Sequence, residues 1–420
     1  MPLPPLCVRP PAVHETVHEV RRVLMISSLW PPIVLGGAET YAAALAAHLR
    51  ARGVDVGVVT LGVEGPDVVD AIPAVGYRLD EFVAQSRARR ARFHAADIYR
   101  PSVTRQIADA IAHFEPDVVH THAVAGLSSA VLAAPGRAST AHVHTVHDYW
   151  LLCQRSTMAR GEGAMCARRC AACAAISLVR NGIVARHPPD VVLAVSRAVA
   201  DAHAEVAWLR DRVRVLHNPI ARIARVNRTS SRSRDSLVFG YLGQLTATKG
   251  VRTLVRAFAA SAIPEARLEI AGSGPLLQDL TREAPDRVRL VGWLDDDGKA
   301  RWLDAIDCLV VPSEWRDPAP LVIGEARARG VPVIGAHVGG IPELIAPECA
   351  PLMFEPGDTN GLATRLREFA DQPATYMSDA PHRDAALLDW DQHVDAVLCA
   401  YRDGCRARAA RTSSVTAVAP

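Results

Sequence analysis

Two acidic residues flank a predicted helix start that suits the binding of an anionic ligand. Asp317 and Glu325 lie eight residues apart, and Pro320 between them is a favourable first residue for a helix. The backbone amides of Leu321 and Val322 would then be unpaired at the helix N-terminus, where they and the helix dipole attract a group such as a diphosphate. Glu325 could accept hydrogen bonds from ribose hydroxyls, and Asp317 could contact a sugar. Capping or solvating the helix start is the alternative for either acid alone.

A lysine follows another predicted strand of the same half of the chain. The segment from Gly243 through Gln244 to Lys249 and Gly250 reads as a short loop after a strand at 237–242. A lysine beside a departing phosphate neutralises the developing negative charge without a metal. The alternative is a solvated surface lysine. The position at the carboxyl end of a strand favours the binding role.

The N-terminal half carries two further candidate segments after strands. Gly36 and Gly37 follow the first predicted strand and permit a ligand to approach the backbone closely. His147, in the sequence His147-Asp148-Tyr149-Trp150, follows another strand. The alternative for the two glycines is an ordinary loop, and the alternative for His147 is a structural role. His120 and His122 are expected to line the same region.

Four cysteines follow the His147 segment at metal-ligand spacing. Cys153, Cys166, Cys170 and Cys173 could supply four thiolates to a structural zinc, or form an insertion without metal. The run Asp295-Asp296-Asp297 precedes a predicted helix, and capping of that helix explains it better than a catalytic metal. The basic run Arg87, Arg89, Arg90 and Arg92 is typical of a solvated surface, with contact to anionic lipid or an acidic acceptor as the alternative.

The composition excludes several classes of protein. The 420 residues carry a net charge of +2 and 5% aromatic residues, which gives no case for nucleic-acid binding. No run of about 18 apolar residues is present, so no spanning helix is expected. The Pro-rich start predicts a flexible leader over residues 1–20 rather than a signal peptide. Nine cysteines without an export signal predict reduced thiols and a cytoplasmic protein, with a peripheral membrane contact left open.

Short apolar runs alternate with Ala-, Leu- and Arg-rich segments on both sides of one polar break. This pattern predicts two α/β domains with buried parallel sheets. Strands are predicted at 23–26, 56–60, 117–120, 142–146, 191–195 and 213–216, and then at 237–242, 268–271, 288–291, 308–311 and 331–334, with a helix at 38–52. The predicted divisions are an N-terminal domain at 21–219 with the cysteine-rich insertion 153–173, a linker at 220–236, a C-terminal domain at 237–375, helices crossing back at 376–408 and a disordered tail at 409–420.

As a set, these segments resemble glycosyltransferase family 4, from about Val23 to Tyr401. Asp317 and Glu325 resemble its Glu-x7-Glu motif, and the 243–250 loop resembles its phosphate-binding loop. The resemblance also includes Ala271-Gly272-Ser273-Gly274-Pro275, His217-Asn218-Pro219 and Gly339-Gly340-Ile341-Pro342-Glu343. It implies the GT-B fold, in which two Rossmann-like domains face each other across a deep cleft.

The resemblance also implies an activity and a set of roles. The expected enzyme is a retaining, metal-independent hexosyltransferase that uses a nucleotide diphosphate sugar and needs no cofactor. His147 matches the histidine that faces the donor sugar, and Gly36 and Gly37 match the loop that closes over the donor phosphates. His147, Asp317 and Lys249 are the predicted catalytic residues. The predicted donor-binding residues are Gly36, Gly37, Gln244, Lys249, Gly272, Asp317, Leu321, Val322 and Glu325.

Two positions depart from the family's pattern. Asp317 stands where Glu is usual, which shortens the arm that reaches the sugar. Gln244 stands where Arg is commoner, which leaves Lys249 as the full positive charge of that loop. These departures make a non-catalytic nucleotide-sugar-binding protein one alternative. A nucleotide-sugar epimerase of the same fold is the other. A nicotinamide-dependent oxidoreductase is disfavoured because no Gly-x-Gly-x-x-Gly follows the first strand. Glycan, lipid-linked and small-molecule acceptors all fit, and the oligomeric state is open.

Overall fold

The computed structural model describes residues 19–72, 86–160, 164–220, 236–376 and 387–416. Most of the predicted leader and linker lies outside these residues. The contacts divide the chain into two compact units. Unit 1 comprises residues 1–156, 169–216 and 391–420, and unit 2 comprises residues 157–168 and 217–390.

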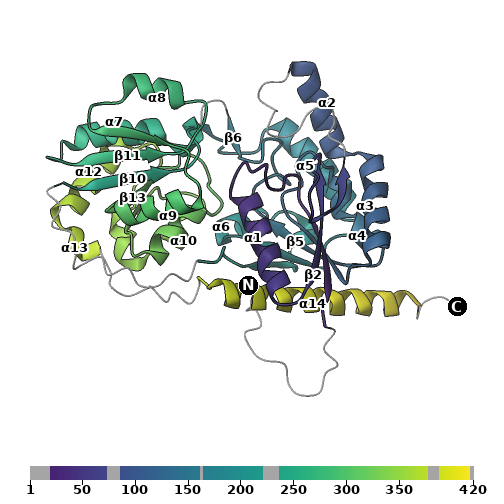
Figure 1. The fold of residues 1–420 in the computed structure, drawn as a ribbon. Coiled ribbons are helices and arrows are strands. Elements are labelled where there is room, and N and C mark those ends of the chain that lie inside the picture. The colour runs from purple at the N-terminus through teal and green to yellow at the C-terminus, as the bar shows by residue number, and fades with distance from the viewer. Residues whose placement is uncertain (1–18, 73–85, 161–163, 221–235, 377–386, 417–420) are drawn as a thin grey trace. The chain divides into compact units, whose positions relative to one another are not determined.

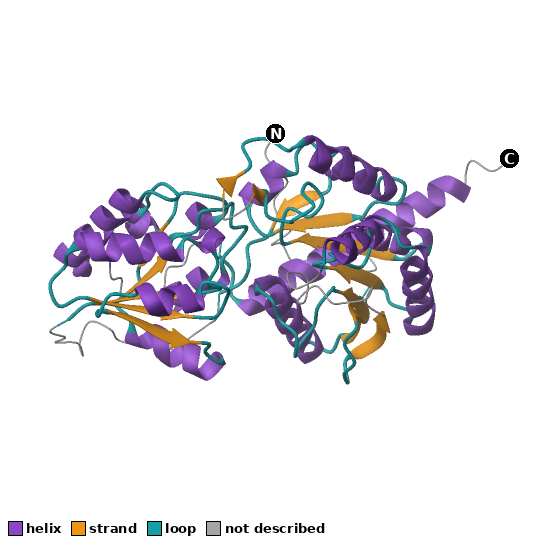
Figure 2. Cartoon of the chain, turned by 90° about the horizontal axis from the view of Figure 1, so that it is seen from above, coloured by secondary structure: helices purple, strands orange, loops and turns teal. Residues whose placement is uncertain are grey.

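Unit 1 is built on a parallel sheet that matches the predicted strands. Its strands are β1 (Arg22–Ile26), β2 (Asp55–Leu61), β3 (Val68–Ile72), β4 (Val118–Thr121), β5 (Ala141–Val146), β8 (Val191–Ala194) and β9 (Val213–Val215), in the order β3-β2-β1-β4-β5-β8-β9. Only β3 is absent from the sequence prediction. Residues 23–26 of β1 are fully buried, because helices cover both faces of the sheet (Figures 1 and 2).

The helices of unit 1 fill the connections between these strands. They are α1 (Gly37–Ala51), α2 (Arg87–Ile98), α3 (Pro101–Phe114), α4 (Ala134–Arg137), α5 (Ala171–Val184), α6 (Arg197–Ala202) and all but the first residue of α14 (Trp390–Thr416), with 3-10 helices η2 (Ser129–Leu132) and η3 (Ala207–Leu209). Amphipathic α3 buries Val103, Ile107 and Phe114. The Phe114 ring approaches the sheet at Gly57, where any side chain would collide with it.

Unit 2 repeats the parallel arrangement with fewer strands. They are β10 (Val238–Leu242), β11 (Arg267–Ala271), β12 (Val288–Gly292), β13 (Cys308–Val311) and β14 (Val333–Gly335), in the order β12-β11-β10-β13-β14. β14 begins two residues later than the predicted 331–334 strand, after Pro332, which has no amide hydrogen for a ladder. The short antiparallel hairpin of β6 (Ala159–Arg160) and β7 (Ala164–Met165) also belongs to this unit.

Apolar side chains cover both faces of the second sheet. Its helices are α7 (Val251–Ser261), α8 (Leu277–Glu283), α9 (Asp296–Ala305), α10 (Leu321–Ala328), α11 (Ile341–Leu344), α12 (Thr359–Asp371) and α13 (Pro373–Tyr376), with 3-10 helices η4 (Ala247–Lys249) and η5 (Pro347–Leu352). Phe239, Phe258 and Phe369 meet edge to face in one core, and Trp302 and Ile306 lie in the other. The sheet is thus a rigid support for its loops.

Each sheet reverses its strand order at one point. In unit 1 the reversal lies between β1 and β4, and in unit 2 it lies between β10 and β13. Ligands of open parallel sheets bind beyond the carboxyl ends of the strands at such a point. The loops after these four strands are therefore the places to look for a site.

The C-terminal tail corrects one prediction. Residues 409–416, predicted to be disordered, continue the long helix α14. Arg408 and Arg411 of this helix pair with the buried carboxylate of Asp190, which anchors the segment to unit 1. Helix-favouring Ala and Arg residues support the extension. Within the described residues, no helix combines the length and apolarity needed to cross a bilayer.

Candidate functional site

Lys249 and Asp317 meet at the reversal point of the second sheet. Lys249 ends η4 in the loop after β10, and Asp317 lies in the loop after β13. The Lys249 Nζ donates to Asp317 Oδ2 at 2.7 Å, and the Ser313 hydroxyl donates to the same oxygen at 3.0 Å. The Lys249 Nζ also lies 5.2 Å from the centre of the Trp315 ring. We call these four residues the lysine–aspartate site.

Glycines allow the loops around this site to approach one another closely. A Cβ on Gly250, whose φ is +69°, would lie 1.8 Å from the carbonyl oxygen of Pro312. A Cβ on Gly339, whose φ is +59°, would lie 2.2 Å from the carbonyl oxygen of Asp317. The Gly340 amide donates to that same carbonyl at 2.8 Å. The backbone of Asp317 is therefore held by contacts that only glycine permits.

The predicted helix start lies beside the lysine–aspartate site, one residue later than expected. Pro320 is the N-cap, and α10 begins at Leu321. Proline fixes its own φ near −65°, and here φ is −61°, but its ψ of 114° is extended. Leu321 and Val322 are thus the first two helical residues, whose amides have no partner inside a helix. This places two backbone donors four and five residues after Asp317.

Glu325 lies one turn into α10 and is already bonded. Its Oε1 accepts from Lys299 Nζ of α9 at 2.7 Å, and the same ammonium lies 3.3 Å from Asp296. The pairing fixes the direction of the Glu325 carboxylate at the first turn of the helix. The structure therefore gives this acid a defined orientation rather than that of a freely solvated side chain.

Gln244 and Gly272 belong to the loops after β10 and β11. The side chain of Gln244 is exposed, and its backbone carbonyl accepts from the Tyr241 hydroxyl at 2.7 Å. Gly272 has a φ of +130°, and a Cβ there would lie 1.9 Å from the carbonyl oxygen of Gly243. These two loops pack backbone to backbone, which explains why Gly is required at position 272.

In unit 1, Gly36 and Gly37 open helix α1 after the first strand. Gly36 is the N-cap and Gly37 the first helical residue, and both are exposed. The Gly36 amide donates to Glu39 Oε2 at 2.8 Å. Burial raises the pKa of Glu39, although this backbone hydrogen bond opposes the shift. A buried carboxylate therefore holds the start of the glycine loop.

His147 lies after β5 in a pocket that is confined to unit 1. The pocket is lined by residues 122–124, 144–148, Trp150 and Leu151. His147 Nε2 lies 3.2 Å from His122 Nδ1. Burial lowers the pKa of His147 to about 3 and raises the pKa of Asp148 to about 6. We call this group the histidine pocket.

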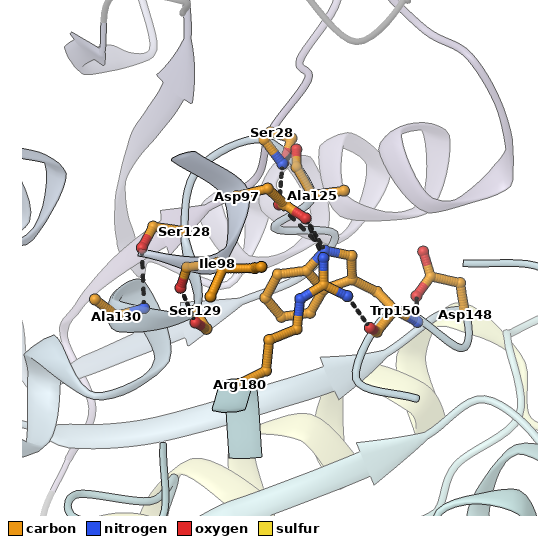
Figure 3. A network of polar contacts seen from close by, with 11 residues as sticks. Ser28, Asp97, Ile98, Ala125, Ser128, Ser129, Ala130, Asp148, Trp150 and Arg180 are labelled. Carbon is orange, nitrogen blue, oxygen red and sulfur yellow. Dashed lines mark hydrogen bonds and ion pairs between the residues drawn. The ribbon is translucent and has the colours of Figure 1, made fainter. Parts of the chain in front are cut away.

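A buried ion pair fastens the loop that carries His147. Figure 3 shows the Arg180 guanidinium between the Asp97 carboxylate and the Trp150 ring. The guanidinium lies 4.3 Å from the ring centre and donates to the Trp150 carbonyl at 2.5 Å, while the indole Nε1 donates to Asp97 Oδ2 at 2.9 Å. Asp97 Oδ1 also accepts from the Gly126 amide at 2.6 Å. Helices α2 and α5 are thereby tied to the loops after β4 and β5.

His120 does not line a cleft, contrary to its prediction. It is fully buried, with Nδ1 2.8 Å from the Tyr401 hydroxyl and Nε2 2.8 Å from the Thr145 hydroxyl. Its two ring nitrogens are satisfied inside unit 1, so its role is structural. His122, two residues later and just past the end of β4, does line the pocket.

The cysteine-rich segment does not bring its four thiols together, as the zinc alternative requires. Among the described residues, no three His, Cys, Asp or Glu side chains are grouped to hold a metal ion. The Sγ atoms of Cys153 and Cys173 lie 4.0 Å apart. Cys166 follows the β6–β7 hairpin, where its amide donates to the Met158 carbonyl. The hairpin belongs to unit 2 and the other cysteines, including Cys170, to unit 1. The four thiols are thus divided between the units.

The remaining charged runs have local roles. Asp295 is the N-cap of α9 and accepts from the Gly298 amide at 2.6 Å, which confirms the capping prediction. Arg89 and Arg92 are exposed on α2, whose N-cap Ser86 accepts from the Arg89 amide. Nothing in these contacts assigns the basic run a ligand.

Several residues of both sites escape sequence reasoning. Asp97 and Arg180 lie 83 residues apart on helices, and neither position carries a local signal of burial. Ser313 and Trp315 stand beside Asp317, so their proximity to the predicted acid is the signal that could have found them. Tyr41 lies edge-on to His147 at 5.2 Å but belongs to an ordinary amphipathic helix.

Comparisons with known proteins place the chain among the glycosyltransferases. Residues 35–222 match the family described as "Glycosyltransferase Family 4", and residues 236–372 match "Glycosyl transferases group 1". A D-inositol 3-phosphate glycosyltransferase of Streptomyces avermitilis is 27% identical, with 96% of this chain and 92% of that protein covered.

Two solved structures show the same fold. The sucrose-phosphate synthase of Thermosynechococcus elongatus matches with a TM-score of 0.67 and 22% identity, over 90% of this chain and 97% of that one. The Anabaena protein Alr3699/HepE, solved in complex with UDP-glucose, matches with a TM-score of 0.60 and 18% identity, over 94% and 100%. These similarities show that the two units form a GT-B fold.

Proposed function

Because the chain belongs to the glycosyltransferases of group 1 and family 4, and is thus a sugar-transferring enzyme, we propose that it moves a hexose-type sugar from a nucleotide diphosphate donor to a hydroxyl acceptor with retention and without a metal. One structural neighbour was solved in complex with UDP-glucose, and one relative is named a D-inositol 3-phosphate glycosyltransferase. They support this class of donor and a hydroxyl-bearing acceptor.

The donor's charged part requires groups that unit 2 offers. Lys249 supplies a positive charge for the diphosphate, and the first amides of α10, at Leu321 and Val322, supply oriented backbone donors. Glu325 accepts hydrogen bonds from the ribose hydroxyls. Gln244, Gly272 and the glycine loop at 36–37 complete the contacts of the donor. Each assignment is the one that the resemblance to glycosyltransferase family 4 implies, and each group lies in the loop or the helix that follows a strand.

The sugar requires neutral and acidic hydrogen-bonding groups. Asp317 accepts from a sugar hydroxyl, and the hydrogen bonds from Lys249 and Ser313 fix the direction of its carboxylate. His147, neutral at physiological pH because burial lowers its pKa to about 3, offers a hydrogen bond beside the reacting carbon. A neutral ring avoids repelling the positive charge that develops there.

Retention follows from attack on the face that the phosphate leaves. The acceptor oxygen forms a bond to the anomeric carbon as the bond from that carbon to the phosphate oxygen breaks. The leaving phosphate oxygen takes the acceptor's proton, so no separate protein base is needed. Lys249 stabilises the resulting nucleotide diphosphate, which makes a metal unnecessary.

The 2.7 Å contact of Lys249 with Asp317 is the observation that carries this proposal. It brings the group for the leaving phosphate and the group for the sugar to one point beside the start of α10. A nucleotide diphosphate sugar has these two parts adjacent to each other. The contact therefore matches the chemistry of the donor.

A donor screen followed by one substitution tests the proposal. UDP-, GDP- and dTDP-sugars are scored by thermal stabilisation and then by nucleotide release with glycan, lipid-linked and small-molecule acceptors. Lys249→Ala is expected to lower kcat at least 100-fold, which corresponds to removal of one group that stabilises developing charge. Arg256→Ala, which removes an exposed positive charge from α7, is the matched control and should keep full activity.

The outcomes separate the alternatives. Binding without any nucleotide release would indicate a non-catalytic protein, and conversion of the donor sugar without an acceptor would indicate an epimerase. An inverted anomeric configuration in the product, read by NMR coupling constants, would refute retention. Loss of activity in EDTA that returns with Mg²⁺ would refute metal independence.

A further inference from the structure

The histidine pocket contains two imidazoles that hydrogen-bond to each other. His122 directly follows β4 and His147 directly follows β5, which are neighbouring strands of the first sheet. The His122 Nδ1 and His147 Nε2 lie 3.2 Å apart, and the two rings stack with centres 5.5 Å apart and an angle of 30°. The proposed transfer assigns His147 to the donor and leaves His122 without a role.

The two rings share one hydrogen between their facing nitrogens. Burial lowers the pKa of His147 to about 3 and that of His122 well below its usual value, so both are neutral near pH 7. A neutral imidazole carries one N–H and one bare nitrogen. A hydrogen bond between two neutral rings therefore couples their tautomers, because the ring that donates uses its only N–H.

The surroundings of His122 favour one of the two arrangements. Its other nitrogen, Nε2, is buried without a hydrogen-bond partner. A buried N–H without an acceptor is costly and rare in proteins. The arrangement that avoids it places the hydrogen of His122 on Nδ1, which then donates to His147 Nε2. His147 must in turn carry its own hydrogen on Nδ1.

Packing prevents His122 from turning away. Its ring centre lies 4.0 Å from that of His120, and its amide donates to the Ile26 carbonyl at 2.9 Å. The ring of Tyr41 lies edge-on to both His122 and His147, and the Tyr41 hydroxyl lies 2.8 Å from His393 Nε2. The imidazole pair is therefore held from three sides by residues of unit 1.

We propose that His122 is a positioning residue, which fixes His147 as the Nδ1–H tautomer and presents that N–H as a donor to an oxygen of the nucleotide sugar. The inference rests on the proposed function for its catalytic consequence. The imidazole coupling itself does not depend on that function. The oxygen is either a sugar hydroxyl or a phosphate oxygen, both of which accept hydrogen bonds.

Two variants of His122 test the inference. His122→Phe keeps an aromatic ring of similar shape but removes the donor, and His122→Asn keeps an amide donor near the position of Nδ1. We expect His122→Phe to lower kcat 10- to 100-fold with less than a threefold change in donor KM. We expect His122→Asn to keep kcat at least tenfold above that of a His122→Phe variant that has lost 100-fold. His142→Phe is the matched control, since His142 is fully buried in the same sheet but bonds to Thr121 instead.

Nitrogen NMR supplies a readout that a merely structural role would not move. In protein with ¹⁵N-labelled histidine, the resonances that vanish in His147→Ala belong to His147. We expect Nδ1 of the native protein to be the protonated type, and the pattern to shift toward Nε2–H in His122→Phe. His122→Asn keeps the donor and should keep the Nδ1–H pattern. An unchanged tautomer of His147 in His122→Phe would overturn the inference, as would a shift to Nε2–H in His122→Asn or native kcat in a folded His122→Phe.

The remaining outcomes keep this inference separate from the proposed function. Should His122→Phe fail to fold, His122→Asn decides the question. Retention of the Nδ1–H form with kcat within tenfold of the native value supports the inference, and a shift to Nε2–H overturns it. Should the native protein transfer no sugar from any donor, the proposed function fails, while the tautomer shift still tests the imidazole coupling.

Discussion

The histidine pocket and the lysine–aspartate site occupy equivalent places in their sheets but are built differently. In unit 1, loops are fastened by buried side chains, such as the Arg180 guanidinium on Asp97 and Trp150. In unit 2, loops are fastened by backbone contacts at Gly250, Gly272 and Gly339. Buried polar side chains make unit 1 sensitive to charge and protonation. Glycine contacts make unit 2 sensitive to any added atom.

Acidification is expected to give the largest difference in stability between the two units. Burial lowers the pKa values of His144 and His203 to about 4. It also lowers those of His120, His122 and His142 well below their usual value. These folded-state values lie below the unfolded value near 6.5, so the unfolded state binds more protons as the pH falls from 6.5 to 4. Stability is therefore present above pH 6.5 and is lost through this window.

The size of this effect can be estimated for unit 1. His144 and His203 each contribute a loss of about 2 kcal/mol between pH 7 and pH 5. Asp148, whose pKa is raised to about 6, takes up a proton in the folded state and offsets about 1 kcal/mol. Hydrogen exchange at pH 5 should show unit 1 peptides losing protection well before those of unit 2. Loss of protection in both units together would contradict the comparison.

Breaking the buried ion pair is the next largest expected effect. Arg180→Ala leaves the Asp97 carboxylate buried without its cation, which should lower the free energy of unfolding of unit 1 by about 3–5 kcal/mol. Urea denaturation followed by tryptophan fluorescence measures it, because Trp150 reports on the loop. Glu205→Ala removes an exposed partner of Arg169 and should change stability by about 0–1 kcal/mol. Equal changes in the free energy of unfolding for the two substitutions would show that the buried ion pair does not stabilise the loop.

A single methyl group tests the glycine construction of unit 2. Gly250→Ala combines a left-handed backbone with a collision against the Pro312 carbonyl, and should cost about 3 kcal/mol and displace Lys249. Gly53→Ala is the control, since its φ is +80° but no atom lies within 4 Å of the added Cβ. It should cost about 1 kcal/mol. Thermal unfolding and nucleotide release measure both variants. Similar losses of stability would show that the collision with the Pro312 carbonyl adds no cost beyond that of the positive φ.

The smallest expected effect comes from a helix cap. Asp295→Ala removes the acceptor of the Gly298 amide and should cost about 1 kcal/mol. Nucleotide release should stay unchanged, because we expect the run at 295–297 to cap α9 rather than to bind a catalytic metal. A loss of activity that Mg²⁺ concentration alters would reverse that interpretation.

The fold and the centre of unit 2 were predictable because they depend on local patterns. Apolar runs place the strands, and Asp317, Lys249 and the glycines each follow a strand in recognisable motifs. The fastening of unit 1 was not predictable, because Asp97, Trp150 and Arg180 pair over long separations. The tail at 409–416 was mistaken for disorder because its anchor, Asp190, lies more than 200 residues away.

Helix α14 has a consequence for the synthesis of the protein. Its side chains complete unit 1, since Tyr401 bonds His120, Asp403 pairs with Arg214 and Arg408 pairs with Asp190. These partners leave the ribosome only after all of unit 2 has been made. Unit 1 therefore cannot complete its folding until α14 has been synthesised, although most of its sequence is made first. Unit 2 has its whole sequence before that point. Truncation before Trp390 should release a chain whose second unit folds and whose first is degraded.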